Sequence, residues 1–395
     1  MSSSNSKHIG IMFVINELRH GGAEHVLFDL AEGLREGGKY RPIVACLRLA
    51  GVMHEQFEQA GIKVYQRLLR DRYDVVVLWR MLEIIRRENV KVIVAVGSGG
   101  NRMFWSSLAG KLAGIKVVVW SHTYSQERYS EFELATRVLF PLVDRVVALG
   151  ERHKRCIMWR DKGRGGRISV IGNGIRIDRF EHPQWRDKAR AKLGLADENV
   201  TAIAMIANLR RSKRHDIFIE SAKKVVANRR DVHFFIIGDG PNRESVRQLV
   251  QESELQGQFL SFIGHRDDLH ELLPGIDIVC ICSEYQECLS LVAIQSMAAG
   301  AVVVSNVIGS MDELIEDGKT GFFYHPLDSE SLAGKLIYVM EHADLRKEVI
   351  ANAREKVKSK FCVERMIGDF CELFDELSGN TYRSEGIIGI GRLIG

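Results

Sequence analysis

Short apolar segments alternate with longer amphipathic segments along most of the 395-residue chain. A short apolar run is typical of a buried strand, and apolar residues at helical spacing are typical of a helix that covers a sheet. Helical patterns lie between most of the strand candidates, which predicts a parallel sheet with crossover helices. The first half of the chain has seven strand candidates, at His8–Ile15, Pro42–Leu47, Ile62–Tyr65, Val90–Val96, Lys116–Trp120, Arg145–Leu149 and Ile168–Ile171.

The same alternation starts again in the second half of the chain. Two successive doubly wound sheets fit this pattern better than one sheet of a dozen strands, because a single open sheet rarely exceeds about ten strands. The predicted fold class is therefore α/β, with two Rossmann-like doubly wound domains. The second set of strand candidates is Thr201–Ala207, Val232–Ile237, Phe259–Ile263, Asp277–Cys282, Ala301–Ser305 and Gly321–Tyr324.

The two domains join near Gly172–Gln184, a segment that contains two glycines and a proline. We place the first domain at residues 7–178 and the second at residues 179–358. The last amphipathic pattern predicts a terminal helix over about residues 359–377, which we expect to pack back on the first domain. Residues 379–395 form a glycine-rich tail to which we assign no function.

Composition and charge exclude several classes of protein. The chain is 46% hydrophobic and 27% charged, and its formal net charge of +4 argues against a general nucleic-acid binder. Its seven cysteines predict reduced thiols, and Cys280 and Cys282 have no second close pair with which to form a zinc site. Met1–Lys7 lacks the apolar core of a signal peptide, and no apolar stretch reaches the roughly 18–20 residues of a membrane span. We therefore expect a cytoplasmic protein that is soluble or peripheral.

Ligands of parallel sheets bind at the carboxyl ends of the strands, so the loops there are the candidate site. Gly21-Gly22-Ala23-Glu24 follows the first strand and opens a helix. Uncovered backbone amides at a helix start can bind a phosphate, although the same sequence also forms an ordinary tight turn. The loop Asn208–His215 follows the first strand of the second half, and its cations have either a diphosphate or solvent as their partner. These cations are Arg210, Arg211, Lys213 and Arg214.

Other strand ends carry further candidates. His122 follows a strand of the first half, where a histidine either donates to a sugar hydroxyl or has a structural part. Glu287 follows a strand of the second half, and Gln295 lies on the next helix; both face either a cleft or solvent. Gly238-Asp-Gly-Pro-Asn-Arg243 has an arginine where a dinucleotide fingerprint needs its third glycine, so we expect no dehydrogenase.

In this order, the segments resemble the retaining glycosyltransferases of family four (glycosyl transferases group 1), which have the GT-B fold. The likeness covers about residues 8–375. It implies two domains that face each other across a cleft, and transfer of a sugar from a nucleotide-sugar donor to an acceptor. The pieces that carry it are Gly21–Glu24, Ser121-His122, Ile171–Ile175 with Asp178 and Phe180, Asn208–Lys213, Ile237–Pro241, Phe262–Gly264, Glu287 through Gly300, and Glu313 with Asp317–Gly321.

The resemblance also implies roles for single residues. The donor would be a UDP- or GDP-sugar, a substrate and not a cofactor, and no metal is expected because cations and helix starts neutralise the diphosphate. The catalytic residues would be His122 beside the transferred sugar, Lys213 on the diphosphate and Glu287 on the sugar hydroxyls. Gln295 would lie at the ribose. The rest of the donor-binding set would be Gly21, Gly22, Asn208, Arg210, Ile263, Arg266, Leu291 and Val292.

This sequence departs from the family pattern at three places. The paired glutamates of the family, eight positions apart, are Glu287 and Gln295 here, and a neutral glutamine makes weaker hydrogen bonds than a carboxylate. The arginine expected five residues before the lysine is Asn208, although two arginines follow it. The small glycine-containing run after the first glutamate is Cys288-Leu289-Ser290. Two alternatives therefore stay open: a non-catalytic nucleotide-sugar-binding protein and a sugar-nucleotide epimerase of the same fold.

The segment Glu151–Arg167 contains seven Lys or Arg residues against two acidic ones, with Met158 and Trp159 among them. An anionic membrane would attract such a segment, and a solvated helix and loop is the alternative. The resemblance implies a glycan or a lipid-linked glycan as the acceptor, as in polysaccharide biosynthesis. If the basic segment binds lipid, the protein works at the inner face of a membrane.

Overall fold

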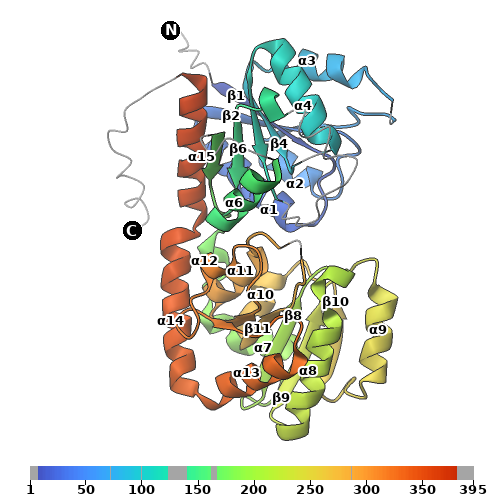
Figure 1. Ribbon diagram of the computed structural model, residues 1–395, viewed down its shortest axis with the longest axis vertical. Helices are drawn as coiled ribbons and strands as arrows, with labels where there is room; N and C mark the ends of the chain where they lie inside the picture. The colour runs from blue at the N-terminus through green and yellow to red at the C-terminus, as the bar shows by residue number, and fades with distance from the viewer. Residues whose placement is uncertain are drawn as a thin grey trace.

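The computed structural model describes residues 8–71, 73–98, 100–122, 140–161, 167–285 and 287–379. Figure 1 shows two α/β domains stacked along the long axis of the molecule, each with one sheet and helices packed around it. All strand pairs of both sheets are parallel. This architecture confirms the predicted fold class.

The first sheet has seven strands in the order β3-β2-β1-β4-β5-β6-β7. The order reverses between β1 and β4, and a reversal of this kind opens a crevice at the carboxyl ends of the strands. The strands are β1 (Ile9–Ile15), β2 (Tyr40–Cys46), β3 (Lys63–Tyr65), β4 (Val90–Val96), β5 (Lys116–Trp120), β6 (Arg145–Ala148) and β7 (Ile168–Val170). The helices are α1 (Gly22–Glu36), α2 (His54–Gln59), α3 (Val77–Arg87), α4 (Gly100–Ala113) and α6 (Glu151–Asp161).

The second sheet has six strands in the order β10-β9-β8-β11-β12-β13, with its own reversal between β8 and β11. Its strands are β8 (Thr201–Ile206), β9 (Val232–Ile237), β10 (Leu260–Gly264), β11 (Ile278–Ile281), β12 (Val302–Ser305) and β13 (Phe322–Phe323). The helices are α7 (Arg186–Lys192), α8 (His215–Asn228), α9 (Arg243–Glu252), α10 (Leu269–Leu272), α11 (Leu291–Ala299), α12 (Met311–Leu314) and α13 (Ser329–Glu341). Every predicted strand is present, within two residues at either end.

Helices cover both faces of these sheets, and the central strands are buried accordingly. Ile11, Met12, Phe13 and Val14 of β1 are fully buried on alternating faces. Burial on both faces explains why the strands read as continuous apolar runs and not as alternating ones. Among the described helices, none has the length and apolar character needed to cross a lipid bilayer.

The terminal helix predicted over residues 359–377 is interrupted. Helix α14 (Ala343–Lys360) lies along the second domain and α15 (Val363–Ser378) lies along the first, and Figure 1 shows the two as a column on one side of the molecule. At the turn between them, the Phe361 carbonyl accepts a hydrogen bond from the Ile175 amide at 2.9 Å. Apolar periodicity continues across this turn, so the pattern alone did not reveal the break. Of the predicted tail, only Gly379 lies within the described residues.

Contacts with the first domain hold α15 in place. The ring of Phe370 packs edge-on against that of Trp120, with centroids 4.9 Å apart. The Tyr40 hydroxyl donates to Asp375 at 2.5 Å, and Lys39 forms an ion pair with the same carboxylate at 2.6 Å. The last helix therefore completes the layer of helices over the first sheet.

Candidate functional site

Both domains contribute to a cavity of about 240 Å³ at the carboxyl ends of their strands. The domains touch here, since a Cβ placed on Gly22 would lie 3.6 Å from a methyl group of Leu291. From the first domain, the lining residues are Gly22, Ala23, His122, Leu149 and Asn173. From the second, they are Met205, Ile206, Ala207, Asn208, Lys213, Cys280, Ile281, Cys282, Ser283, Glu287, Cys288, Leu289, Ser290, Leu291 and Val292.

The glycine loop forms the first-domain edge of this cavity. Gly21 caps α1 in an extended conformation, and the helix starts at the exposed Gly22. A Cβ at Gly21 would contact the carboxylate of Glu24, which folds back over this turn. Burial raises the pKa of Glu24, while hydrogen bonding to its backbone amide and the charge of Arg102 act in the opposite direction. Gly22 and Ala23, at the start of α1, line the cavity, and the Glu24 carboxylate folds back to accept a hydrogen bond from its own amide.

Lys213 and Glu287, two residues predicted for the site, form an ion pair in the cavity wall. Both side chains are largely buried, with 23% and 12% of their surface exposed. The hydroxyl of Ser283 donates to the same Glu287 oxygen at 2.9 Å. Lys213 closes a 3-10 turn after β8, and Glu287 lies in the loop between β11 and α11, so the two sheet-end loops converge on one charge pair.

A glycine on a neighbouring loop fixes the backbone at Glu287. The amide of Ser310 donates to the Cys288 carbonyl at 2.7 Å. Gly309 has a φ of 56°, and a Cβ there would overlap the Glu287 carbonyl oxygen. Only glycine combines this left-handed backbone with so close an approach. No local pattern around Gly309 indicates this role.

The sequence Gly238-Asp-Gly-Pro supports the Asn208 loop and does not line the cavity. Leu209 donates its amide to the Asp239 carbonyl at 3.0 Å, and Asn242 donates to the Leu209 carbonyl at 2.9 Å. A Cβ at Gly240 would lie 2.8 Å from the Leu209 carbonyl oxygen. The glycines therefore permit close packing of the two loops.

His122 lies at the end of β5 with its imidazole against Trp120, the ring centroids being 4.5 Å apart. Burial, reinforced by the nearby His153 and Arg102, lowers the pKa of His122 to about 3. Its Nε2 atom is buried and has no hydrogen-bond partner among the described residues. A neutral imidazole with an unused nitrogen therefore lines the cavity.

Five residues predicted for donor binding do not line the cavity: Gly21, Arg210, Ile263, Arg266 and Gln295. Gly21 adjoins it, and Arg210 is exposed beside the Asn208 loop. Arg266 donates two hydrogen bonds to Asp268, at 2.7 and 2.6 Å. Gln295 lies one turn beyond the start of α11, and Ile263 is in β10. The roles of all five stay predictions.

Sequence reasoning also missed residues of the site. Asn173 is buried in the wall, and its Oδ1 atom has no hydrogen-bond partner among the described residues. The sequence analysis placed it at the domain junction and in the Ile171–Ile175 piece of the family resemblance, but gave it no role in the site. Glu313 accepts a hydrogen bond from the Arg152 amide at 3.0 Å and so caps α6 across the domain boundary. Such contacts depend on how the domains meet, which local sequence does not reveal.

Two family models match the chain, one for each domain. Residues 20–179 match the model described as Glycosyltransferase Family 4, and residues 186–356 match Glycosyl transferases group 1. Together these matches span most of the chain, which belongs to this glycosyltransferase family and is an enzyme of that class. The membership decides for sugar transfer against the two alternatives, a binding protein and an epimerase.

Relatives with known roles are distant. The chain is 24% identical to N-acetyl-alpha-D-glucosaminyl L-malate synthase of Bacillus anthracis, over 80% of this chain and 82% of the relative. It is also 24% identical to alpha-D-kanosaminyltransferase of Streptomyces kanamyceticus, over 76% and 81% respectively.

Solved structures share the whole two-domain fold. HepE of Anabaena, in complex with UDP and glucose, superposes with a TM-score of 0.82 at 22% identity, over 94% of this chain and all of that one. A glycosyltransferase of Rickettsia africae gives a TM-score of 0.83 at 23% identity, over 95% of this chain and all of that one. At these identities the likeness demonstrates the GT-B fold.

Proposed function

We propose that this enzyme transfers a sugar from a UDP- or GDP-sugar to a glycan or lipid-linked glycan, with retention at the anomeric carbon and without a metal. The observation that carries the proposal is the Lys213–Glu287 ion pair, set opposite the open start of α1 in a cavity between the domains. A diphosphate fits this arrangement because one wall offers a cation and the other offers the backbone of Gly22 and Ala23 at a helix start.

Exchange of partners explains how the site accepts its donor. Without a donor, Glu287 neutralises Lys213. An arriving diphosphate competes for the ammonium group, and the carboxylate released from it can accept hydrogen bonds from sugar hydroxyls. Ser283 keeps its hydrogen bond to Glu287 and limits the movement of the carboxylate.

The transfer step needs no acid or base of unusual strength. The bond between the anomeric carbon and the phosphate oxygen breaks, and the acceptor oxygen bonds to the same face of the sugar. The acceptor proton passes to the departing phosphate oxygen. Neutral His122 is placed to hydrogen-bond the transferred sugar, while Lys213 and the amides of α1 stabilise the charge on the diphosphate. These groups supply the neutralisation that a metal would otherwise provide.

A lipid-linked acceptor is supported by the surface of the first domain. Four neighbouring apolar side chains are strongly exposed: Tyr73 (83%), Val75 (68%), Val76 (49%) and Trp79 (72%). Exposed arginines at positions 67, 70, 86 and 87 accompany them, with acids at 71 and 83. Apolar and cationic side chains on one segment suit an anionic bilayer surface. We therefore propose residues 67–87 as the membrane contact.

The segment that the sequence analysis predicted for membrane contact, Glu151–Arg167, gives weaker support for membrane binding than the segment around Trp79. Trp159 and Met158 of α6 are 59% and 38% exposed. Positions 162–166, which hold two of its cations, lie outside the described residues.

Incubation of the enzyme with radiolabelled UDP- and GDP-sugars tests the reaction. We expect slow hydrolysis without acceptor, transfer to membrane extracts, and rates that do not fall in the presence of EDTA. Binding without turnover, or conversion into an epimeric sugar nucleotide, would overturn the proposed reaction. Loss of transfer in EDTA would overturn its metal independence.

A further inference from the structure

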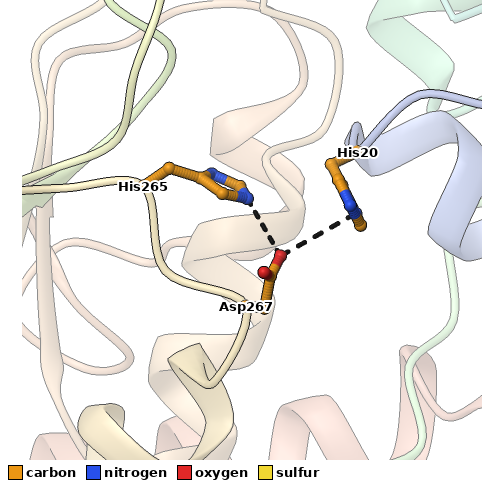
Figure 2. A group of neighbouring side chains, drawn as sticks. All are labelled: His20, His265 and Asp267. Atoms are coloured by element: carbon orange, nitrogen blue, oxygen red, sulfur yellow. Dashed lines mark hydrogen bonds and ion pairs between the residues drawn. The ribbon is translucent and has the colours of Figure 1, made fainter. Parts of the chain in front are cut away.

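A cluster of three metal-ligating side chains spans the two domains outside the cavity. His20 belongs to the first domain and immediately precedes the glycine loop, whereas His265 and Asp267 belong to the second and follow β10. Figure 2 shows both imidazoles directed toward the Asp267 carboxylate from opposite sides. We propose that these residues bind a divalent transition-metal ion of the zinc type, which clamps the domains together.

The distances suit this occupant. The Nε2 atom of His265 lies 3.0 Å from Asp267 Oδ1, and the Nδ1 atom of His20 lies 3.9 Å from the same oxygen. One ligand atom from each residue lies within 4.8 Å of the other two. Tetrahedral zinc with bonds of about 2.0–2.2 Å separates its ligand atoms by roughly 3.3 Å. Small side-chain rotations at the surface therefore bring all three onto one ion.

The neighbouring cations pair with Asp268 and not with Asp267. Arg266 and Lys192 both interact with Asp268, Arg266 through two hydrogen bonds and Lys192 at 3.2 Å. Among the described residues, His20 and His265 are the ion-pair partners of the Asp267 carboxylate, and the charge of Asp267 also acts on the nearby His25. A single carboxylate between two imidazoles matches the preference of zinc, nickel and cobalt, whereas magnesium and calcium prefer oxygen ligands throughout.

The exposure of the cluster determines what the ion does. His20, His265 and Asp267 have 41%, 47% and 73% of their side-chain surface exposed, so an ion can enter from solvent and keeps an open position for water. With a ligand from each domain, the bound ion restrains opening of the cleft. Donor entry and product release need that opening, so the ion slows turnover without taking part in the chemistry.

Zinc binding to the full, metal-stripped chain tests the site by isothermal titration calorimetry. We expect one zinc site in the wild type, at least about 10-fold weaker binding in both His20→Ala and Asp267→Asn, and no response to magnesium. Loss of a direct ligand should cost no less than the 10–100-fold known for groups that only orient ligands. The control is His325→Ala, which removes an exposed histidine of the second domain outside the cluster.

Small-angle scattering tests the clamp separately. Zinc should reduce the radius of gyration of the wild type and of His325→Ala, and leave that of His20→Ala unchanged. Absence of a zinc site in the wild type, or full zinc affinity in His20→Ala, would overturn the proposal. A zinc-bound wild type with unchanged dimensions would overturn the clamp. Neither measurement uses a sugar nucleotide, so its outcome is independent of the proposed reaction.

Discussion

Lys213 donates a hydrogen bond to Glu287, and these side chains come from loops that are 74 residues apart in the chain. In the absence of a donor, each side chain neutralises the charge of the other. The pair is preorganised by Ser283 and by the backbone of Gly309 and Ser310. The Lys213 ammonium group and the Glu287 carboxylate are therefore paired before a ligand binds, and ligand binding must separate them.

Substitution Lys213→Ala should weaken donor binding. Loss of a charged hydrogen bond of about 1.5–3 kcal/mol corresponds to roughly 10- to 150-fold in affinity. Calorimetry with UDP- and GDP-sugars measures this change. Lys319→Ala, which removes an exposed lysine paired with Glu316, is the control and should bind as the wild type. Unchanged affinity in Lys213→Ala would remove this residue from the diphosphate site.

Substitution Glu287→Gln keeps the size of the side chain and removes its charge. We expect turnover to fall by about 100-fold or more, because preorganised electrostatic contacts are typically of this magnitude. The melting temperature should also fall, because Lys213 loses the charge of its partner in a largely buried pair, although the hydrogen bond from Ser283 can still be accepted by the amide oxygen. Transfer at the wild-type rate would show that the carboxylate does not act on the sugar.

Substitution Gly309→Ala should destabilise the protein and reduce turnover together. The left-handed backbone costs alanine about 1–2 kcal/mol, and the overlap with the Glu287 carbonyl adds to this. Gly334→Ala is the matched control: it lies within α13, where an added Cβ meets nothing within 4 Å. The free energy of unfolding of this control, measured by urea denaturation, should rise by about 0.5–1 kcal/mol. Equal stability of the two variants would contradict the packing described at Gly309.

The lowered pKa of His122 predicts how the free energy of unfolding depends on pH. Burial lowers its pKa from 6.5 to about 3, so between these values the unfolded chain binds a proton that the folded chain does not. The free energy of unfolding should therefore fall as pH decreases below about 6.5. Urea denaturation at pH 7 and pH 4.5 should show a smaller decrease for His122→Gln than for the wild type. His215, whose pKa burial lowers to about 4, acts in the same direction in both proteins.

An identical pH response in His122→Gln and the wild type would show that the imidazole is solvated. His325→Gln is the control for the loss of an exposed histidine and should leave the response unchanged.

The proposed membrane contact predicts an effect of Trp79→Ala on lipid binding. Partition into anionic vesicles at low salt should weaken at least about 5-fold, which corresponds to about 1 kcal/mol of lost apolar burial. Co-sedimentation measures the bound fraction. Tyr338→Ala, which removes a 40% exposed aromatic side chain of the second domain, should bind as the wild type. Vesicles that fail to retain the wild type would end the membrane proposal.

The sequence predicted the strands well because burial on both faces imposes continuous apolar runs. His122, Lys213 and Glu287, which the sequence analysis placed in loops after strands, all line the cavity, and their roles stay predictions. Positions beyond these loops were harder to place. Gln295 is a helical turn into α11 and Ile263 lies within a strand, and spacing alone does not fix the direction of either side chain.

Contacts between distant segments left no local signal. Gly309 acts on Glu287 through a loop that follows the next strand, and Glu313 caps a helix of the other domain. The His20–His265–Asp267 cluster forms only where the domains meet. Each depends on the tertiary arrangement, which no single window of sequence contains.

The chain passes between the domains twice, and the two passages are bonded to each other. Ile175 donates to Phe361 and accepts from Val363, both at 2.9 Å, and a Cβ at Gly174 would lie only 2.5 Å from the Cys362 carbonyl. Because the two crossings are bonded to each other, we expect the domains to open by rotation about this point and not by sliding past each other. Truncation before Cys362 would leave one connection between the domains. It would also remove α15, so the first domain would lose a covering helix although the deletion lies at the other end of the chain.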